Sequence, residues 1–332
     1  MRYLSVLLSV FVMGVFTSCK QKTTQPAEDI EKSETAQTIK AADFNADTAY
    51  FFVGQQVKFG PRVPNTIAHK QCASWLESTL KKYSSQVIVQ PFTAKAYDGT
   101  VLNCRNIIAS FNPKSTTRVL LCSHWDSRPY ADNDPDSAYH RTPIDGANDG
   151  ASGVGILLEI ARQLKISPAS IGVDILLLDG EDYGAPQDAG FMGSDDWALG
   201  SQYWSRYPHV PSYTARYGIL LDMVGAENAV FTMEGTSMYY APDIAQKIWN
   251  MGATIGYSDY FSRERTNAIT DDHVYINQLR QVPTIDIIQH DQSTQSGFYQ
   301  NWHTIKDNMK GISKPTLMAV GQTVLTTVKY EN

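Results

Sequence analysis

The chain has 332 residues, of which 42% are hydrophobic and 11% aromatic, a length and composition that suit one large globular domain with a substantial core. Its net charge of −6 comes without any long basic run, so the electrostatic footprint of a nucleic-acid-binding protein is missing. We therefore exclude a disordered chain, and we exclude nucleic acid as a partner.

Residues 1–19 have the features of an export signal. Arg2 is followed by an apolar stretch over residues 4–16, which is too short to span a bilayer comfortably. Small and hydroxyl residues then lead to Cys19, in a loose version of the bacterial lipoprotein signal in which this cysteine is lipidated. We expect an extracytoplasmic protein, anchored in a membrane by a lipid on Cys19 and facing the periplasm or the cell surface. The alternative, a plain secretory signal, also places the protein outside the cytoplasm.

The residues after the signal divide into a flexible linker and a domain. Residues 20–43 are polar and contain no aromatic residue, so they cannot bury enough apolar surface to fold. From 44 to 332, hydrophobic and turn signals alternate without a second linker, which predicts one domain. This domain contains Cys72, Cys104 and Cys122, an odd number that implies no closed disulfide framework. At most one bridge could form, and we favour three buried thiols.

Helical periodicity and short β-rich runs alternate along the domain. The predicted helices are 47–59, 69–83, 155–164, 243–251 and 315–330. The predicted strands are 86–92, 106–111, 118–123, 173–178, 217–221 and 284–288. Several strands, such as VDILLL at 173–178, are apolar on consecutive residues, which is typical of central strands covered by helices on both faces. We predict an α/β fold, a three-layer α/β/α sandwich around a mixed, mostly parallel sheet.

Acidic and histidine side chains follow the predicted strands. Ligands of open α/β sheets bind beyond the carboxyl ends of the strands, so these positions are the place to look for function. His124 and Asp126 follow the strand 118–123, Glu181 and Asp182 follow 173–178, Asp222 follows 217–221, Asp145 and Asp149 precede the helix 155–164, and His303 lies in a late loop.

This grouping of carboxylates and histidines predicts a bound cation. Clustered carboxylates without matching basic side chains repel one another and resist ionisation unless a cation neutralises them. Aspartate oxygen and histidine nitrogen without thiolate suit zinc, and a catalytic zinc keeps three protein ligands and an open position. We therefore predict a zinc-dependent catalytic domain over 44–332.

From about residue 59 to 308 the chain resembles the zinc exopeptidase-like α/β family shared by co-catalytic aminopeptidases and glutaminyl cyclases. In that family the metal is bound by the Asp of a D-[GSN]-A-S-G loop, the second acid of a G-E-[ED] pair and a late His. The resemblance places these ligands at Asp149, Asp182 and His303. It also implies that Glu181, the first acid of the pair, is the general acid/base.

Flanking motifs resemble the glutaminyl cyclase branch of this family. They are FGPRVPNT at 59–66, HWDSRPYAD at 124–132, DDHVYINQLRQVP at 271–283, and W-H-T at 302–304 with D-N following at 307–308. The resemblance implies a transferase, a glutaminyl-peptide cyclotransferase, which converts the N-terminal glutamine of peptides and proteins to pyroglutamate and releases ammonia. It also implies one zinc per chain, a substrate-handling carboxylate pair of Asp222 and Asp271, His124 as a neighbour of the site, and Trp302 as a pocket wall.

Two positions depart from the animal enzymes of this branch. Ser123 and Val154 stand where those enzymes have a disulfide beside the zinc loop, so we predict that this bridge is absent. Asp286 stands where they have a pocket histidine, and it is either an acceptor behind the site or a pocket acid; we favour the former. We expect the remaining histidines to be structural or exposed, and a further set of aromatics to serve mainly in packing: His69, His140, His209, His273 and His290; Trp125, Tyr183, Phe298 and Tyr299.

Two other functions stay open at this point. A di-zinc aminopeptidase of this fold uses the H-x-D histidine and the Asp of a D-M motif for its second metal, and His124 and Asp222 match both positions. A second zinc is therefore not excluded. A catalytically silent surface lipoprotein that binds peptides or glycans is the other alternative, although no metal ligand is missing. The sequence contains no signal for an oligomeric state.

Overall fold

The computed structural model describes residues 39–190 and 195–332. The signal 1–19, the predicted lipid site at Cys19 and most of the linker 20–43 lie outside the described residues. Within the described ranges, no helix combines the length and the hydropathy that crossing a membrane requires.

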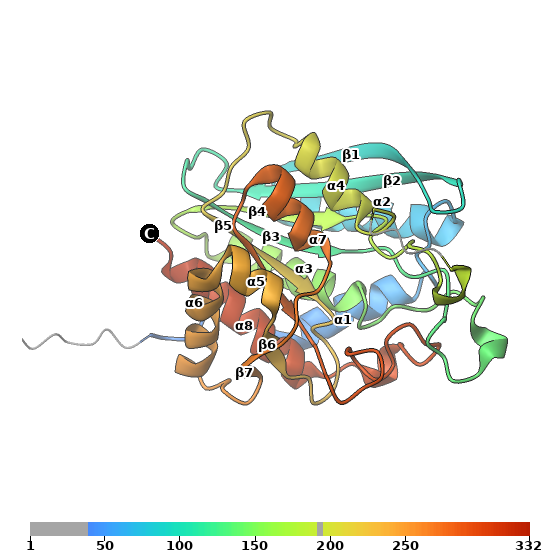
Figure 1. Cartoon of the computed structure of the whole chain (residues 1–332). Coiled ribbons are helices and arrows are strands. Elements are labelled where there is room, and N and C mark those ends of the chain that lie inside the picture. Colours follow the sequence, from blue (N-terminus) through green and yellow to red (C-terminus); the bar gives the residue numbers. More distant parts are fainter. Residues whose placement is uncertain (1–38, 191–194) are drawn as a thin grey trace, which may run out of the picture. The chain divides into compact units, whose positions relative to one another are not determined.

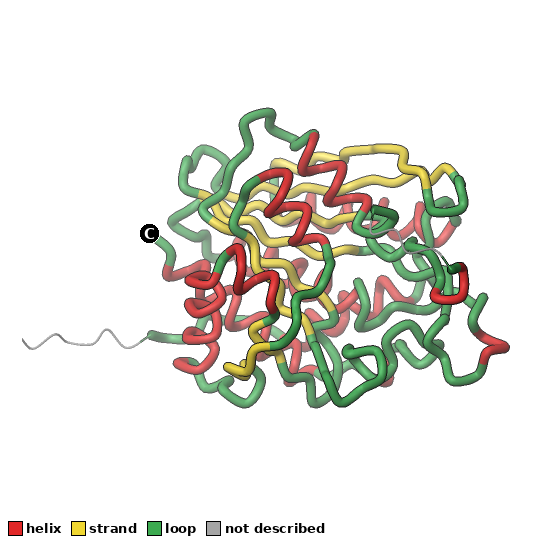
Figure 2. The backbone as a smooth tube through the Cα atoms, viewed as in Figure 1, coloured by secondary structure: helices red, strands yellow, loops and turns green. Residues whose placement is uncertain are grey.

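A six-stranded sheet forms the centre of the domain, in the order β1-β2-β4-β3-β5-β8. The strands are β1 (Gln86–Lys95), β2 (Val101–Phe111), β3 (Arg118–His124), β4 (Gly172–Leu178), β5 (Tyr217–Asp222) and β8 (Thr284–Ile288). β1 and β2 pair in antiparallel fashion with each other and β2 with β4, whereas β4, β3, β5 and β8 run parallel. Figure 2 shows these strands, in yellow, lying side by side between helices.

Five helices pack against one face of this sheet and enclose the larger core. They are α1 (Ala46–Val57), α2 (Ile67–Tyr83), α3 (Ala151–Ile166), α6 (Pro242–Thr254) and α8 (Lys314–Tyr330). Alternate strand residues such as Val119, Leu121 and Ile219 point into this core, as the two-residue period of a strand requires.

The opposite face carries α4 (Leu199–Arg206) and α7 (Asp272–Tyr275), the latter continued by one π-helical turn, Ile276–Arg280. Trp204 of α4 and Ile276 pack there on Leu120 and Leu220, the strand residues that point away from the first core. Short elements complete the domain: α5 (Gly235–Tyr240), the strand pair β6 (Phe231–Met233) and β7 (Phe261–Arg265), and 3₁₀ turns at Ser137–Tyr139, Gln187–Ala189 and Met309–Gly311.

The predicted architecture is confirmed, because four parallel strands and one antiparallel edge lie between two helical layers. All predicted helices and strands are present, with ends shifted by at most five residues, and 284–288 matches β8 completely. Side-chain caps fix several helix starts; Asn45 accepts from the Thr48 amide and Thr66 from the His69 amide. The elements that prediction missed, including α4 and α5, are shorter than the window in which a helical period can be read.

The cysteine prediction is also confirmed. Cys72, Cys104 and Cys122 are buried and unpaired. Burial raises the pKa of the Cys72 thiol to about 12, so this group is an inert packing residue at neutral pH.

Candidate active site

The parallel strands deliver the predicted site residues to one edge of the sheet. β3 ends at His124, β5 ends at Asp222, and the turn after β4 carries Glu181 and Asp182. All three strands run in the same direction, so their carboxyl ends meet. Asp149 reaches the same place from the loop that starts α3.

Gly150 allows the Asp149 loop to approach the end of β3 closely. Its φ of +90° is a left-handed conformation that side chains disfavour, and a Cβ there would lie 2.7 Å from the carbonyl oxygen of Asp126 and 2.9 Å from the His124 ring. The glycine of the D-G-A-S-G sequence is therefore needed to bring Asp149 beside His124.

Asp149, Asp182 and His303 form the first group of ligand-type side chains. The His303 Nε2 atom lies 3.1 Å from Asp182 Oδ1 and 3.5 Å from Asp149 Oδ2, and none of the three side chains is more than 4% exposed. Neither carboxylate oxygen of Asp182 forms a hydrogen bond with the described residues. A buried polar atom without a partner costs about 1–3 kcal/mol, so these oxygens point to a missing cation.

The histidine of this group is oriented for metal binding. His303 Nδ1 faces Asp132 Oδ1 at 3.5 Å, and its Nε2 atom faces the two aspartates; with the Nδ1 proton directed at Asp132, the Nε2 lone pair would be available to a metal. Arg128 holds Asp132 through two hydrogen bonds of 2.6 and 2.8 Å. Oxygen and nitrogen ligands without sulfur, with one buried lone pair among them, fit a zinc ion.

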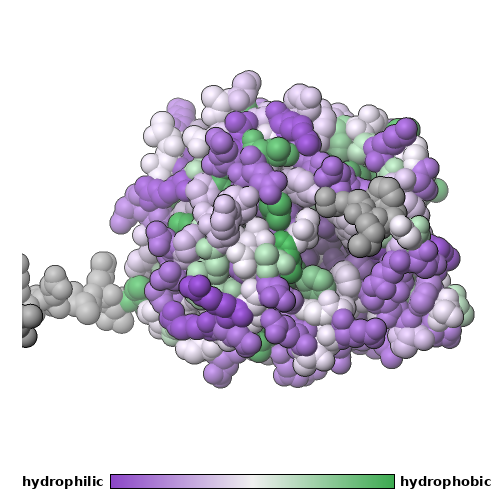
Figure 3. All heavy atoms as spheres, viewed as in Figure 1, coloured by the Kyte–Doolittle hydropathy of each residue, from purple (hydrophilic) through white to green (hydrophobic). Residues whose placement is uncertain are grey.

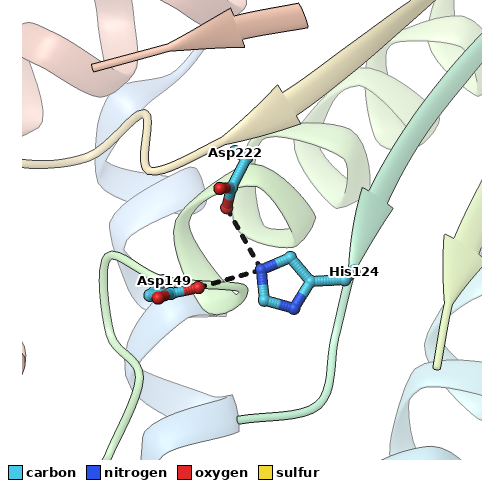
Figure 4. Close-up of side chains that lie close together, drawn as sticks. All are labelled: His124, Asp149 and Asp222. Carbon is cyan, nitrogen blue, oxygen red and sulfur yellow. Dashed lines mark hydrogen bonds and ion pairs between the residues drawn. The ribbon is translucent and has the colours of Figure 1, made fainter. Parts of the chain in front are cut away.

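His124, Asp149 and Asp222 form a second group, drawn in Figure 4. His124 Nε2 lies 3.0 Å from Asp149 Oδ1 and forms a hydrogen bond of 3.1 Å with Asp222 Oδ1. The two groups therefore differ in one respect. Asp222 Oδ1 accepts a hydrogen bond from His124, whereas neither carboxylate oxygen of Asp182 has a hydrogen-bond partner among the described residues.

The Glu181–Asp182 turn is held by a third acid. The Asp126 carboxylate accepts the Glu181 amide at 3.1 Å and the Asp182 amide at 3.2 Å, and Asp126 is completely buried. The acid of the H-x-D motif, Asp126, thus fixes the backbone that carries the candidate base and one candidate ligand.

Burial and mutual repulsion disturb the acids around this edge. Burial, reinforced by Asp149, raises the pKa of Asp182 to about 6 and that of Asp222 to about 7. Burial also raises the pKa of Glu181 well above its usual range; the positive charge of His124 opposes this rise and the nearby Asp271 adds to it. Groups that resist ionisation together in this way are typical of a site completed by a cation.

A cavity of about 460 Å³ opens over these acids. Its polar floor contains Glu181, Asp222 and Asp271, and its apolar walls are Met223, Trp197, Ile269, Ile288, Phe298 and Trp302. The ring of Trp302 stacks on His303 with centroids 3.7 Å apart. Figure 3 shows that hydrophobic side chains gather in a band near the middle of this otherwise hydrophilic face.

Asp286 lies behind this cavity and does not line it. It is completely buried in β8, its carboxylate has no hydrogen-bond partner among the described residues, and His273 Nδ1 lies 3.9 Å away. His273 in turn bonds Glu234 through Nε2 at 3.1 Å. This buried His273–Glu234 pair has no counterpart in the sequence motifs, because its members are 39 residues apart.

The other predicted packing residues are distributed as follows. His69 is buried against Asp179 at 2.9 Å, and Trp125 stacks on its ring. Tyr183 packs on the cluster around Phe92, away from the cavity lining, whereas Phe298 contributes to the cavity wall. Sequence patterns did not identify Trp197 as a cavity wall residue. They also did not identify Arg128 and Asp132, although both belong to the HWDSRPYAD motif.

Comparison with known proteins agrees with this fold and site. The model of peptidase family M28 matches residues 106–328, and the fold is that of the zinc exopeptidase-like α/β proteins. The chain belongs to peptidase family M28. Both the family and the donor set indicate zinc as the metal.

Three solved structures cover the domain almost completely. A Zn-dependent exopeptidase from Parabacteroides distasonis is 52% identical, with a TM-score of 0.87, and the match covers 88% of this chain and 100% of that one. Bacteroides thetaiotaomicron glutaminyl cyclase bound to N-acetylhistamine is 53% identical, with a TM-score of 0.86, and the match covers 88% of this chain and 100% of that one. A leucine aminopeptidase precursor from Bacteroides thetaiotaomicron is 52% identical, with a TM-score of 0.85, and the match covers 89% of this chain and 100% of that one.

Among curated proteins, the glutaminyl-peptide cyclotransferase of Gloydius blomhoffii is 28% identical over 246 residues. The match covers 64% of this chain, and the chain spans 61% of the length of that relative.

Proposed function

We propose that the protein is a zinc-dependent glutaminyl cyclase with one zinc per chain. The observation that carries this proposal is the difference between the two ligand-type groups that share Asp149. Both carboxylate oxygens of Asp182 are buried without a hydrogen-bond partner among the described residues, while Asp222 accepts a hydrogen bond from His124. Similarity to a solved glutaminyl cyclase over 88% of this chain supports the same function.

Asp149, Asp182 and His303 would hold the zinc, which supplies Lewis-acid polarisation of the glutamine side-chain carbonyl. The rest of the chemistry falls to side chains of the cavity. The substrate α-amine must be neutral to attack the side-chain amide carbon, and the amide nitrogen must leave as ammonia.

Glu181 is the group that moves the proton. Its carboxylate accepts a proton from the α-amine nitrogen as the new C–N bond forms, and delivers it to the amide nitrogen as the old C–N bond breaks. Burial raises the pKa of Glu181, which favours its proton-carrying form, and a bound dication would act in the opposite direction.

The remaining cavity residues position the substrate. Asp222 and Asp271 lie on the polar floor, where their oxygens can accept N–H groups of the amine and amide. Trp302 offers a flat apolar wall for the glutamine methylene groups. Asp286, shielded from the cavity, acts behind Asp271 and does not contact substrate.

The decisive test offers purified protein two peptides that differ only in their first residue, Gln or Leu. We expect the Gln peptide to lose one ammonia and keep its length, and the Leu peptide to remain intact. Release of free leucine would contradict the proposal and support the aminopeptidase. No reaction with either peptide by zinc-loaded protein would support a silent binding protein.

A di-zinc aminopeptidase is the second candidate. His124, Asp149 and Asp222 lie close enough together to serve as a second ligand set, and the similar leucine aminopeptidase precursor favours this reading. Metal analysis separates the two functions. We expect about one zinc per chain for the cyclase, whereas two would support the peptidase.

We also propose that the protein acts outside the cytoplasm, held to a membrane by a lipid on Cys19. The apolar run 4–16 and the small residues before Cys19 support this address. Metabolic labelling with a fatty-acid analogue should mark the wild-type chain and leave Cys19→Ala unlabelled. Equal labelling of both, or labelling of neither, would contradict the anchor.

A further inference from the structure

Asp307, which has no part in the proposed reaction, binds the backbone of the loop that carries Asp149. The Asp307 carboxylate accepts the Asn148 amide at 2.8 Å through Oδ1 and the Asp149 amide at 3.0 Å through Oδ2. The backbone carbonyl of Asp307 accepts the preceding amide, that of Ala147, at 3.3 Å. Three consecutive amides of the loop therefore bind one residue, and Asp307 is 1% exposed.

The other end of the same loop is held by Arg62, which is completely buried. Its guanidinium donates to the carbonyl oxygens of Asp145 and Gly146, and also to that of Trp125 beyond β3. The Arg62 guanidinium therefore donates to carbonyl groups of the loop, and the Asp307 carboxylate accepts from its amides. Both charged groups come from segments distant in sequence.

The position of Asp307 in the chain links this contact to the candidate metal site. Asp307 follows His303 by four residues, so the segment that supplies one metal ligand also clamps the loop that supplies another. His303 itself has a φ of +53°, a left-handed conformation that a histidine keeps only when its surroundings hold it. Fixing residue 307 on the Asp149 loop provides such a restraint.

We propose that Asp307 is a positioning residue for the metal centre, which sets the separation of Asp149 and His303. The inference rests on the proposed zinc site, although not on the reaction carried out there. Asp307 touches neither metal nor substrate in this account. It acts through the backbone amides beneath Asp149.

Asp307→Asn is a sharp probe, since it keeps the size of the side chain. An amide has one acceptor oxygen, so one of the two loop amides would face an NH₂ group and lose its bond. Residues that orient metal ligands in this way typically contribute about 10- to 100-fold in metal affinity. We expect a loss of zinc affinity in that range.

The matched control is Asp174→Asn. Asp174 is also a buried carboxylate that accepts several hydrogen bonds, and it lies at the opposite edge of the sheet. Both variants should lower the melting temperature of the metal-free protein, because both lose buried hydrogen bonds. Only Asp307→Asn should weaken zinc binding.

The experiment measures zinc affinity by competition with a chromogenic chelator, without substrate, and records the visible spectrum of the Co²⁺-loaded proteins. We expect Asp307→Asn to bind zinc 10- to 100-fold more weakly than the parent and to change the Co²⁺ bands, with Asp174→Asn matching the parent in both. Parent-like affinity in Asp307→Asn, or an equal loss in both variants, would overturn the proposal.

If Asp307→Asn does not fold, Asp307→Glu takes its place, since it keeps the charge and displaces the carboxylate by one methylene. Parent-like zinc affinity in that variant would likewise overturn the proposal. A parent that binds zinc yet cyclises no peptide would refute the proposed function and leave this inference standing.

Discussion

Buried acids at the two ends of the parallel strands differ in their hydrogen bonding. We call the side of the sheet where these strands begin the amino edge, and the side where they end the carboxyl edge. At the amino edge, Asp174 accepts four hydrogen bonds, from Ser110, from two nitrogens of Arg118 and from Tyr213. At the carboxyl edge, both oxygens of Asp182 are buried without a hydrogen-bond partner among the described residues.

The amino edge contains a second example. Glu331 accepts hydrogen bonds from Tyr217, Lys247 and Arg216, at 2.6 to 2.8 Å. At that edge the protein neutralises its own acids with cations and hydroxyls. At the carboxyl edge several acids are also held by the protein, but Asp182, between His303 and Arg128, has no hydrogen bond of its own among the described residues. This difference marks the active site more clearly than the mere presence of acids.

The largest effect should come from the acid that moves the proton. Glu181→Gln removes the carboxylate from the carboxyl edge and leaves the three proposed ligands intact. We expect kcat/KM for a Gln-leading peptide to fall by about 10²- to 10⁴-fold, with zinc content unchanged. Glu331→Gln, the corresponding change at the amino edge, should leave kcat/KM as it was. Retained turnover in Glu181→Gln would remove this residue from the mechanism.

Stripping the metal should affect stability through the carboxyl edge alone. A ligand present at 1,000 times its Kd stabilises the folded state by about 4 kcal/mol. We expect chelation to lower the free energy of unfolding by that order, as measured by urea titration with and without zinc. The His303→Ala variant provides the control and should show little response to zinc. A full response in that variant would move the metal to another site.

Removing the charge of Asp174, the partner of Arg118 at the amino edge, should lower stability and leave activity unchanged. Asp174→Asn leaves the Arg118 guanidinium, whose side chain is 13% exposed, without its counter-charge. The expected loss is about 3 kcal/mol in the free energy of unfolding. Peptide turnover per folded molecule should match the wild type. A selective fall in turnover would contradict the separation of a stabilising amino edge from a catalytic carboxyl edge.

The smallest effect concerns Glu331. Burial raises the pKa of this carboxyl, but hydrogen bonds from Lys247 and Tyr217 outweigh burial and hold it below its usual range. A lowered pKa in the folded state contributes stability above the unfolded pKa, about 4.3, and loses it as the pH falls through the folded value. Glu331→Gln should therefore cost up to about 1 kcal/mol at pH 7, and the difference should shrink below about pH 4. A difference that grows in acid would contradict this account.

The sequence predicts the carboxyl edge well wherever a strand points to it. Glu181 and Asp222 follow strands whose apolar runs are unmistakable, so their meeting follows from parallel pairing alone. His303 and Asp271 lie outside the predicted strands and helices; His303 was noted among the clustered ligand-type residues, but its role as a metal ligand, and the role of Asp271, came only from the family resemblance. Nothing local to either loop fixes where it crosses the sheet edge.

What the sequence could not reveal are contacts between distant segments. Asp307 binds amides 158 and 159 residues earlier, and a backbone acceptor leaves no mark on the residues it holds. His273 and Glu234 pair across 39 residues without a motif. Trp197 reaches the cavity from a loop with no period to read. Each depends on tertiary packing, which pattern and propensity do not encode.

Anomalous scattering at the zinc absorption edge, from crystals grown with zinc, would locate the metal in the protein. We expect one peak per chain, among Asp149, Asp182 and His303, where both oxygens of Asp182 have no hydrogen-bond partner among the described residues. A peak between His124 and Asp222, or no peak at the carboxyl edge, would contradict it.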